Sequence, residues 1–456
     1  MASRVINVLT NVVELELDLQ DQVSLKIDNI FRSKVNSNIL QLKKIISNDH
    51  ILAIVIDAEV EIRIGDVFEN TKRSILVPVG QNAKNKVFDI RGNEINTGKL
   101  PDSKFIEMNS LAKRPKSVKP HNQIMETGIK VIDFFIPIIK GHKLGILGGA
   151  GVGKTVLMKE IIFNSNKGKT KTSSIFIGSG ERSREGLELY EELRESNLMK
   201  NTTMFVAQMN ESPGARMNIV PMGISAAEYL RDYEKEDVFV FIDNIYRFLQ
   251  GANEISSSLG KKPSLGGYQS TLSTDVAEVQ DRLHASQNNA ITSFQTVFLP
   301  MDDLSDPAAV ALFDHLDGTL VLSREQVAKN LYPAFDPLSS NSNSVNPQII
   351  GEKHFQAILE AKAILQKYKE LEDVILILGI QELDKESQII VEKALQLQNF
   401  FTQRFFVAQN YTKQAGVYVT LEDTVNSVIE IINGKYLGVH PEKFSFIGTT
   451  RDLATK

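Results

Sequence analysis

A match to the pattern GxxxxGK[ST] begins at Gly148 and reads Gly148-Gly149-Ala150-Gly151-Val152-Gly153-Lys154-Thr155. Glycines let backbone N–H groups turn toward an anion, Lys154 can reach the β- and γ-phosphates of a nucleotide, and the Thr155 hydroxyl can ligate Mg²⁺. A Gly-rich turn without a ligand is the alternative. The flanking sequence argues against this alternative, because a short apolar run ends at Leu147 and helical spacing begins at Val156. The sequence therefore predicts a phosphate-binding loop that opens a helix, and we include Val156 in the nucleotide-binding set.

Two apolar, strand-like runs further along the chain lead into charged residues. The run 174–177 is followed by Glu181 and Arg182, and the run 238–242 leads directly into Asp243. Ligands of open α/β sheets bind at the carboxyl ends of strands, so Asp243 is a candidate Mg²⁺ ligand. Glu181 could polarise a water for attack on a terminal phosphate, and Arg182 could offset the developing charge.

Both assignments have a structural alternative. An aspartate such as Asp243 at the end of a strand can instead cap the next helix. Glu181, Arg182, Arg184 and Glu185 can instead form exposed ion pairs at the start of a helix. The candidate sites are nevertheless a catalytic set of Glu181, Lys154 and Arg182 and a metal set of Thr155, Asp243 and Glu185.

Composition limits the classes of function. The chain has 456 residues, a hydrophobic content of 42% and a formal net charge of −5. This length predicts two or three domains, and the charge gives no general attraction to nucleic acid. The chain has no Cys, which excludes thiolate zinc sites and cysteine nucleophiles and fits a cytosolic location. The apolar run 131–139 is too short to span a bilayer, so we expect any membrane association to be peripheral.

The periodicity of apolar residues changes along the chain. Short strand-like runs fill the N-terminal region, including 13–19, 51–56 and 60–64, and predict a small β-barrel over 1–76. From 144 to 322, strand-like runs alternate with helical segments, which predicts a parallel sheet within a domain over 77–350. Helical spacing and the capping box Thr420-x-x-Asp423 predict a helical domain over 351–456. A Pro- and Lys-rich stretch at 101–123 predicts a solvated connector, with a basic nucleic-acid patch as the alternative.

Taken together, the motifs resemble one family, the catalytic β subunit of rotary F-type ATP synthases and ATPases. The resemblance covers most of the chain, and its motifs occur in the family's order: GGAGVGKT at 148–155, GERSREG at 180–186, NESPGAR at 210–216, FIDNIYRF at 241–248, GYQSTLSTD at 267–275 and DDLSDPA at 302–308. It implies an N-terminal β-barrel, a central RecA-like α/β domain and a C-terminal helical domain. A ring helicase or secretion ATPase would share the loop and Asp243 but not the last two motifs.

The resemblance also implies site residues and partners. Lys154, Thr155, Glu181, Arg182 and Asp243 match the family's positions for phosphate, magnesium, water and Walker B chemistry. Adenine would bind an aromatic pocket of Tyr332, Phe405 and Tyr411, which without the resemblance would be ordinary core residues. The implied ligands are Mg²⁺ and ATP or ADP. The implied partners are noncatalytic α-like subunits in a hexameric ring, which supply an arginine in trans, a γ-like central stalk and, indirectly, a membrane sector.

Two further interpretations stay open, and the first rests on departures from the family pattern. The N-terminal 75 residues match the family poorly. The acidic loop DELSEED, which carries a charge of −5, is here Gln381-Glu382-Leu383-Asp384-Lys385-Glu386-Ser387, with three acids and one lysine giving −3 + 1 = −2. One alternative is a specialised F-type-like motor of the kind attributed to surface or gliding machinery. The other is a nucleotide-binding structural subunit without turnover, which requires Glu181 to be misplaced or the neighbouring subunit to supply no arginine.

Overall fold

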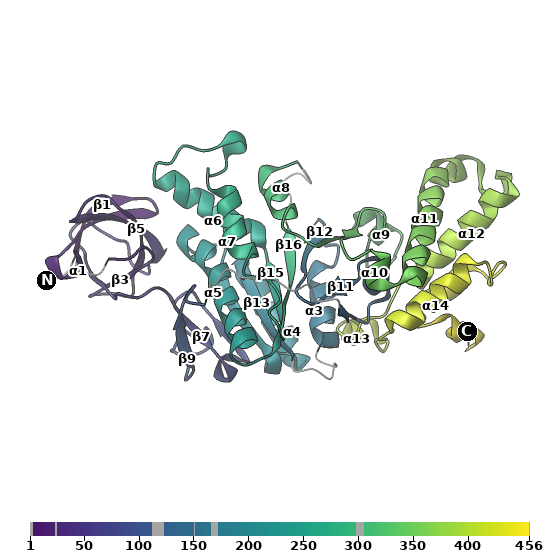
Figure 1. Cartoon of the computed structure of the whole chain (residues 1–456), viewed down its shortest axis with the longest axis horizontal. Helices are drawn as coiled ribbons and strands as arrows, with labels where there is room; N and C mark the ends of the chain where they lie inside the picture. The colour runs from purple at the N-terminus through teal and green to yellow at the C-terminus, as the bar shows by residue number, and fades with distance from the viewer. Residues whose placement is uncertain are drawn as a thin grey trace. The chain divides into compact units, whose positions relative to one another are not determined.

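The structure, a computed structural model, describes residues 3–22, 25–111, 123–149, 151–165, 172–297 and 305–455 (Figure 1). The chain divides into two compact units. The first comprises Met1–Lys119 and Thr170–His315, and the second comprises Pro120–Lys169 and Leu316–Lys456. The first unit thus joins the N-terminal region to one part of the predicted central domain, and the second joins the other part to the C-terminal region.

The N-terminal region is a closed barrel, visible as the ring of purple ribbons near the N-terminus in Figure 1. Apolar side chains from all of its strands fill the interior, among them Val13, Phe31 and Phe68, each 0% exposed. The strands are β1 (Ser3–Leu9), β2 (Val12–Glu16), β3 (Ile30–Ser33), β4 (Ile39–Ile45), β5 (His50–Asp57) and β6 (Val67–Asn70), and a short helix α1 (Leu19–Gln22) follows β2. They pair in the order β1-β2-β5-β4-β3-β6, so the predicted barrel is confirmed.

One strand predicted within this region is wrong, because residues 60–64 form a loop. The Asn38 side chain satisfies the backbone of Val60: its Nδ2 donates to the Val60 carbonyl at 2.7 Å, and its Oδ1 accepts from the Val60 N–H at 3.2 Å. Of the alternating apolar residues, only Ile62 is buried, at 8% exposure, whereas Ile64 is 70% exposed. The alternating apolar residues at 60–64 therefore do not mark a strand, because only the side chain of Ile62 packs into the barrel core.

The sheet of the first unit consists of parallel strands in the order β16-β15-β13-β14-β8. Their bounds are β8 (Lys86–Phe88), β13 (Thr172–Glu181), β14 (Thr202–Gln208), β15 (Asp237–Asp243) and β16 (Ile291–Val297). Helix α5 packs on β13, β14 and β15. The helices of this unit's central part are α4 (Ser183–Glu195), α5 (Pro213–Asp232), α6 (Ile245–Ser258), α7 (Leu272–Gln280) and α8 (Pro307–Phe313), and β7 (Leu76–Val79) pairs with β9 (Lys104–Glu107).

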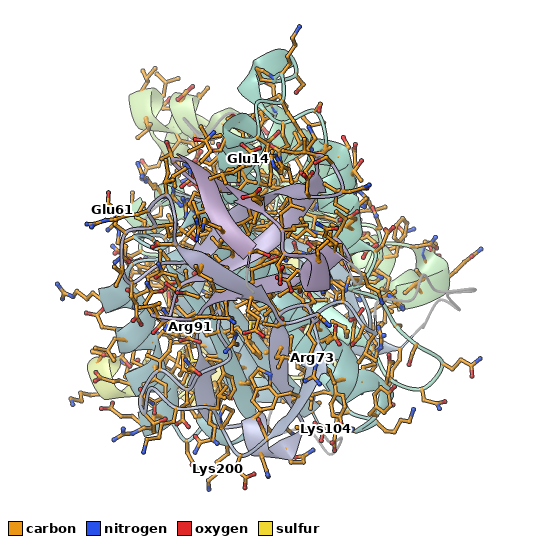
Figure 2. The ribbon with its side chains drawn as sticks, turned by 90° about the vertical axis from the view of Figure 1, so that its left-hand side faces the viewer. Glu14, Glu61, Arg73, Arg91, Lys104 and Lys200 are labelled. Carbon is orange, nitrogen blue, oxygen red and sulfur yellow. The ribbon has the colours of Figure 1, made fainter. Side chains whose placement is uncertain are left out.

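The barrel is fastened to the start of α5 and to the segment after β8. The Ser212 hydroxyl donates to the Ile56 carbonyl at 2.5 Å, and a Cβ added at Gly214 would collide with the carbonyl of Val55 in β5. Arg91, labelled in Figure 2, forms ion pairs with Asp57 and with Glu59, the latter at 2.8 Å. The barrel and the first unit's sheet thus belong to one body.

The second unit contains the remaining sheet strands and the C-terminal helices. Strand β17 pairs in parallel with β12 and antiparallel with β18. The strands are β10 (Ile124–Met125), β11 (Ile138–Ile139), β12 (Lys143–Leu147), β17 (Gly318–Val321) and β18 (Asn341–Ser342). The helices are α2 (Lys130–Phe135), α3 (Lys154–Ser165), α9 (Arg324–Ala328), α10 (Pro347–Ile350), α11 (Glu352–Leu378), α12 (Lys385–Phe400), α13 (Gln409–Thr412) and α14 (Leu421–Ile432).

The C-terminal helices α11, α12 and α14 pack together, as Figure 1 shows. The helical spacing of the sequence is borne out in α11, where Ile358, Ala361 and Leu365 are buried on one face and Tyr368 is partly buried. The predicted cap of α14 is confirmed, because the Thr420 hydroxyl accepts from the Asp423 N–H at 3.2 Å. Within the ranges that the structure describes, we find no helix with the length and apolarity needed to cross a bilayer.

Candidate functional site

The glycine-rich loop joins the end of β12 to the start of α3, which confirms the predicted strand–loop–helix arrangement. Gly151 and Gly153 have φ values of +79° and +93°, and a Cβ at either position would meet nothing within 4 Å. Glycine is therefore favoured at both positions by the positive φ of the backbone and not by a lack of space, because the space above both residues is open. The Lys154 Nζ donates to the Gly148 carbonyl at 2.7 Å, so the ammonium group lies within the loop. Ala150 falls outside the described residues.

The first two glycines of the loop face neighbours in the second unit. Gly148 has φ +152°, and a Cβ there would lie 2.7 Å from the Leu322 carbonyl oxygen. A Cβ at Gly149 would lie 2.9 Å from Nη2 of Arg324. Arg324 is exposed and has no ion pair among the residues that the structure describes. A cation that the sequence analysis missed thus lies beside the loop.

The position of Arg324 follows from sheet topology. Strand β17 runs parallel to β12 with Val321 opposite Leu147, and Arg324 opens α9 just after β17. Residues that follow the two strands therefore reach the same edge of the sheet. The alternating pattern predicted over 144–322 ends with the apolar run 319–322, and the carboxyl end of this run is the signal that could have identified Arg324.

Two of the three predicted base-binding aromatics are accessible. Tyr332 is 44% exposed and Tyr411 is 79% exposed, whereas Phe405 is 9% exposed and packs in the interior. The Gln403 N–H donates to the Tyr332 carbonyl at 2.9 Å. The chain segment that carries Phe405 and leads into α13 with Tyr411 is therefore attached to Tyr332 by a main-chain hydrogen bond.

Glu181, Arg182 and Asp243 lie in the first unit, near the ends of neighbouring strands. Strands β13 and β15 are parallel with Gly178 opposite Asp243, and the register of β13 shifts before its last residue, Glu181. Gly180, which has a φ of +66°, lies at this register shift. A Cβ added to Gly180 would lie 3.0 Å from the side chain of Arg247. The Asp243 carboxylate accepts from the Thr296 hydroxyl at 2.5 Å. The side chain of Glu181 falls outside the described residues.

Arg182 and Glu185 form an ion pair at 3.4 Å, with side chains 73% and 53% exposed. Arg184 pairs with Glu188 in the same helix at 2.7 Å. The exposed ion-pair cluster that the sequence analysis kept as an alternative is therefore present in part. Over the described residues, no three His, Asp or Glu side chains are grouped to hold a metal. The predicted Mg²⁺ ligands belong to different units: Thr155 to the second, Asp243 and Glu185 to the first.

Three of the motifs that resemble the family meet through a hydrogen-bonded chain in the first unit. The Tyr246 and Tyr268 hydroxyls lie 2.9 Å apart, and the Tyr268 hydroxyl donates to the Asp306 carboxylate at 2.8 Å. Burial, followed by these two partners, raises the pKa of Tyr268 well above its usual value. Asp306 also caps α8 by accepting from the Ala308 N–H at 2.9 Å. FIDNIYRF, GYQSTLSTD and DDLSDPA thus contribute to one structural network.

Comparisons with known proteins agree with this architecture. Residues 128–342 match the nucleotide-binding domain of the ATP synthase alpha/beta family, and residues 344–441 match the C-terminal domain of V and A type ATP synthase. The chain is also 48% identical over 430 residues to a protein of Mycoplasmopsis pulmonis (strain UAB CTIP) named ATP synthase subunit beta 2, covering 94% of this chain and 92% of that protein. The chain belongs to the ATP synthase alpha/beta family. Family membership confirms the resemblance and supports ATPase or ATP synthase activity.

Proposed function

We propose that this chain is the catalytic β-type subunit of a rotary ATPase, which hydrolyses or synthesises MgATP. The observation that carries the proposal is the loop at 148–155, where left-handed glycines leave open space above the backbone and the Lys154 ammonium lies within the loop. Family membership and the name of the Mycoplasmopsis pulmonis protein support it.

The residues of the loop fit a triphosphate. Lys154 would exchange its bond to the Gly148 carbonyl for phosphate oxygens, and the open space over Gly151 and Gly153 would admit those oxygens to the backbone amides. Arg324 would add a further positive charge near Gly149. Bound Mg²⁺ would neutralise negative charge on the phosphate oxygens.

The metal and catalytic assignments are part of the same proposal. Thr155 would ligate Mg²⁺ directly, and Asp243, held by Thr296, would bind it through water. Glu185 would enter the metal set by releasing Arg182, because their exposed ion pair contributes at most about 1 kcal/mol. Arg182 would then be available to the phosphates. Glu181 would polarise the attacking water.

Adenine would bind to aromatic faces in the second unit. Tyr332 and Tyr411 expose enough of their rings to stack on a base, and Phe405 would form the apolar floor of the pocket. Tyr332, Phe405 and Tyr411 belong to the same unit as the glycine-rich loop, which supports this proposal.

The substitution Glu181→Gln tests the catalytic assignment. The amide cannot accept a proton, so phosphate release by the purified native complex should fall by about 10² or more while nucleotide binding is retained. Glu191→Gln, the same change at an exposed position of α4, is the matched control and should leave both unchanged. Undiminished turnover in the Glu181 variant would contradict the catalytic role of Glu181. Nucleotide binding without phosphate release by the unaltered complex would instead favour the alternative of a structural nucleotide-binding subunit.

The proposed assembly is a hexameric ring with noncatalytic α-like subunits that supply an arginine in trans. Such arginines contribute about 10³-fold or more in related phosphoryl transfer. The isolated chain should therefore hydrolyse ATP slowly, and addition of the α-like partner should raise kcat steeply. An isolated chain that already works at the rate of the complex would contradict a shared site.

The proposed contact with a γ-like stalk lies at the tip between α11 and α12. Asp384 caps α12 by accepting from the Ser387 N–H at 2.9 Å, so one of the tip's acids has a structural role. The end of α11 is apolar and accessible, since Leu376, Ile377 and Leu378 are 83%, 81% and 59% exposed. We therefore propose that apolar contact outweighs charge here. Replacing residues 381–387 by DELSEED should leave ATP binding unchanged and alter the salt dependence of assembly.

The weak charge of this tip favours a second candidate, a specialised rotary motor that is not coupled to protons. In either case the chain would be cytoplasmic and held at the membrane face only through its partners, without contact to nucleic acid. Purification of the native complex separates the candidates. Proton-channel subunits in the complex would support the synthase, and their replacement by other membrane-anchored chains would support the specialised motor.

A further inference from the structure

Glu160 is a buried carboxylate on α3, six positions after Lys154. Its side chain is 0% exposed, and it lies among the buried apolar residues Leu157, Ile161 and Ile162 of the same helix. Burying a carboxylate is costly unless hydrogen bonds replace its hydration. A glutamate at this place therefore calls for partners of the right kind.

Its partners include two successive backbone amides of the C-terminal region, besides Nδ2 of Asn164, which lies 3.5 Å from Oε1. Oε1 accepts from the Phe406 N–H and Oε2 from the Val407 N–H, each at 3.1 Å. Hydrogen bonds from amides to an ionised carboxylate are stronger than those between neutral groups. The two oxygens thus fix both the position and the direction of the main chain at 406–407 relative to α3.

A second contact holds the same segment. The ring of Phe406 stacks on Phe163, one turn after Glu160 in α3, with centroids 4.9 Å apart and planes 22° from parallel. Residues 405–407 are therefore attached to α3 by a carboxylate and by a ring pair, and α3 is the helix that the phosphate-binding loop opens.

The other end of this segment is anchored at the proposed base pocket. Gln403 donates its N–H to the Tyr332 carbonyl, and its side-chain Nε2 donates to the carbonyls of Gly128 and Val417 at 2.7 Å each. Its Oε1 accepts from the Lys130 N–H at 2.8 Å. Between these anchors lies Phe405, and α13 with Tyr411 follows directly.

We propose that Glu160 is a positioning residue that sets the distance between the phosphate-binding loop and the adenine-binding aromatics. This rests on the proposed function, in which Tyr332, Phe405 and Tyr411 bind the base. Glu160 touches neither the phosphates nor the base; it holds the base-binding segment on the helix that begins at Lys154. The part of the affinity that depends on the base therefore requires Glu160, and the part that depends on the phosphates does not.

The test compares MgATP with magnesium tripolyphosphate, which has the phosphates but no base, on the full chain. In Glu160→Gln the side chain keeps its length, but its amide nitrogen cannot accept, so one of the two N–H bonds is lost. The Kd for MgATP should rise about tenfold, and the Kd for tripolyphosphate should not change. Glu360→Gln, the same change on the exposed side of α11, should alter neither.

Each other outcome decides against the proposal. Equal weakening of both ligands would mean that Glu160 supports the loop or the fold, and no change in either would mean that the 405–407 segment does not need it. If Glu160→Gln does not fold, Phe406→Leu provides a second test because it removes the ring stack. This variant should also raise the Kd for MgATP and leave the Kd for tripolyphosphate unchanged. Failure of tripolyphosphate and MgATP to bind the unaltered chain would instead refute the proposed function.

Discussion

The contact between Gly149 and Arg324 predicts a specific non-additivity. An alanine Cβ at position 149 would lie 2.9 Å from Nη2, 3.0 Å from Nε and 3.2 Å from Cζ of Arg324. Gly149 is not among the residues with positive φ, so alanine brings no backbone strain there. The colliding atoms end a flexible, exposed side chain. In Gly149→Ala the loop should therefore keep its conformation, and the guanidinium should move away from it.

The expected cost is the loss of one cation beside the phosphates. A hydrogen bond to a charged group contributes about 1.5–3 kcal/mol, and the exposure of Arg324 places it at the lower end. A loss of ~1.5 kcal/mol corresponds to about a tenfold rise in Kd. Gly149→Ala and Arg324→Ala should each weaken MgATP binding about tenfold, and the double variant should be no weaker than either, because both remove the same interaction.

Isothermal titration calorimetry with MgATP measures the Kd in four full-length proteins: the unaltered chain, the two single variants and the double variant. Gly151→Ala is the control, because its Cβ would meet nothing within 4 Å and its φ of +79° makes it act through backbone strain alone. Its effect should add to that of Arg324→Ala. If the losses for Gly149→Ala and Arg324→Ala also add, the guanidinium does not act at the loop, and the reasoning is refuted.

Three further predictions concern single positions. Lys154→Ala should abolish ATP turnover and greatly weaken MgATP binding, because phosphate charge is left uncompensated; near-normal phosphate release would contradict the loop assignment. Gly148→Ala should impair binding more than Gly149→Ala, because its Cβ would meet the fixed Leu322 carbonyl at 2.7 Å; equal Kd values in titration would show that this backbone yields. Burial raises the pKa of Glu211 to about 7 from 4.5, so the folded state binds the extra proton and its stability falls as pH rises from about 4.5 to 7. Glu211→Gln keeps an acceptor for the Gln208 N–H and cannot ionise, so it should gain about 3 kcal/mol over the unaltered chain at pH 8 and nothing below pH 4.5; identical thermal unfolding midpoints across pH would contradict the partly buried, neutral carboxyl.

The parts of the fold that the sequence predicted are those set by local chemistry. The glycine-rich loop was predictable because Gly151 and Gly153 adopt positive φ, which few other residues tolerate. The cap at Thr420 was predictable because its hydroxyl bonds within the same turn. Strand β14 was missed, since Thr202-Thr203 gives it a polar start although both side chains are buried. Strand β8 spans only Lys86–Phe88 and is too short for a periodic signal.

The missed parts of the site depend on contacts between distant segments. Arg324 reaches the loop only because β17 pairs with β12. Glu160 interrupts the apolar face of α3, and its partners Phe406 and Val407 follow more than 200 positions later, with sequence separations of 246 and 247. Helical periodicity shows that a charged residue lies on the apolar face of the helix, but it does not identify the backbone N–H groups that bond to its carboxylate.

The joint between the barrel and α5 bears on how this protein can change over time. At Ser212 and Gly214 the nearest barrel atoms are main-chain carbonyls, those of Ile56 and Val55. Main-chain groups are the same whichever side chain a strand carries, so substitutions in β5 leave this part of the joint intact. The matched family segments begin at residue 128, after the barrel. The backbone contacts at Ser212 and Gly214 would therefore tolerate sequence drift in the barrel. The side chains of Gln41, which accepts from Asn218 Nδ2 at 2.9 Å, and of Asp57, which pairs with Arg91, would be the positions where substitution disturbs the contact.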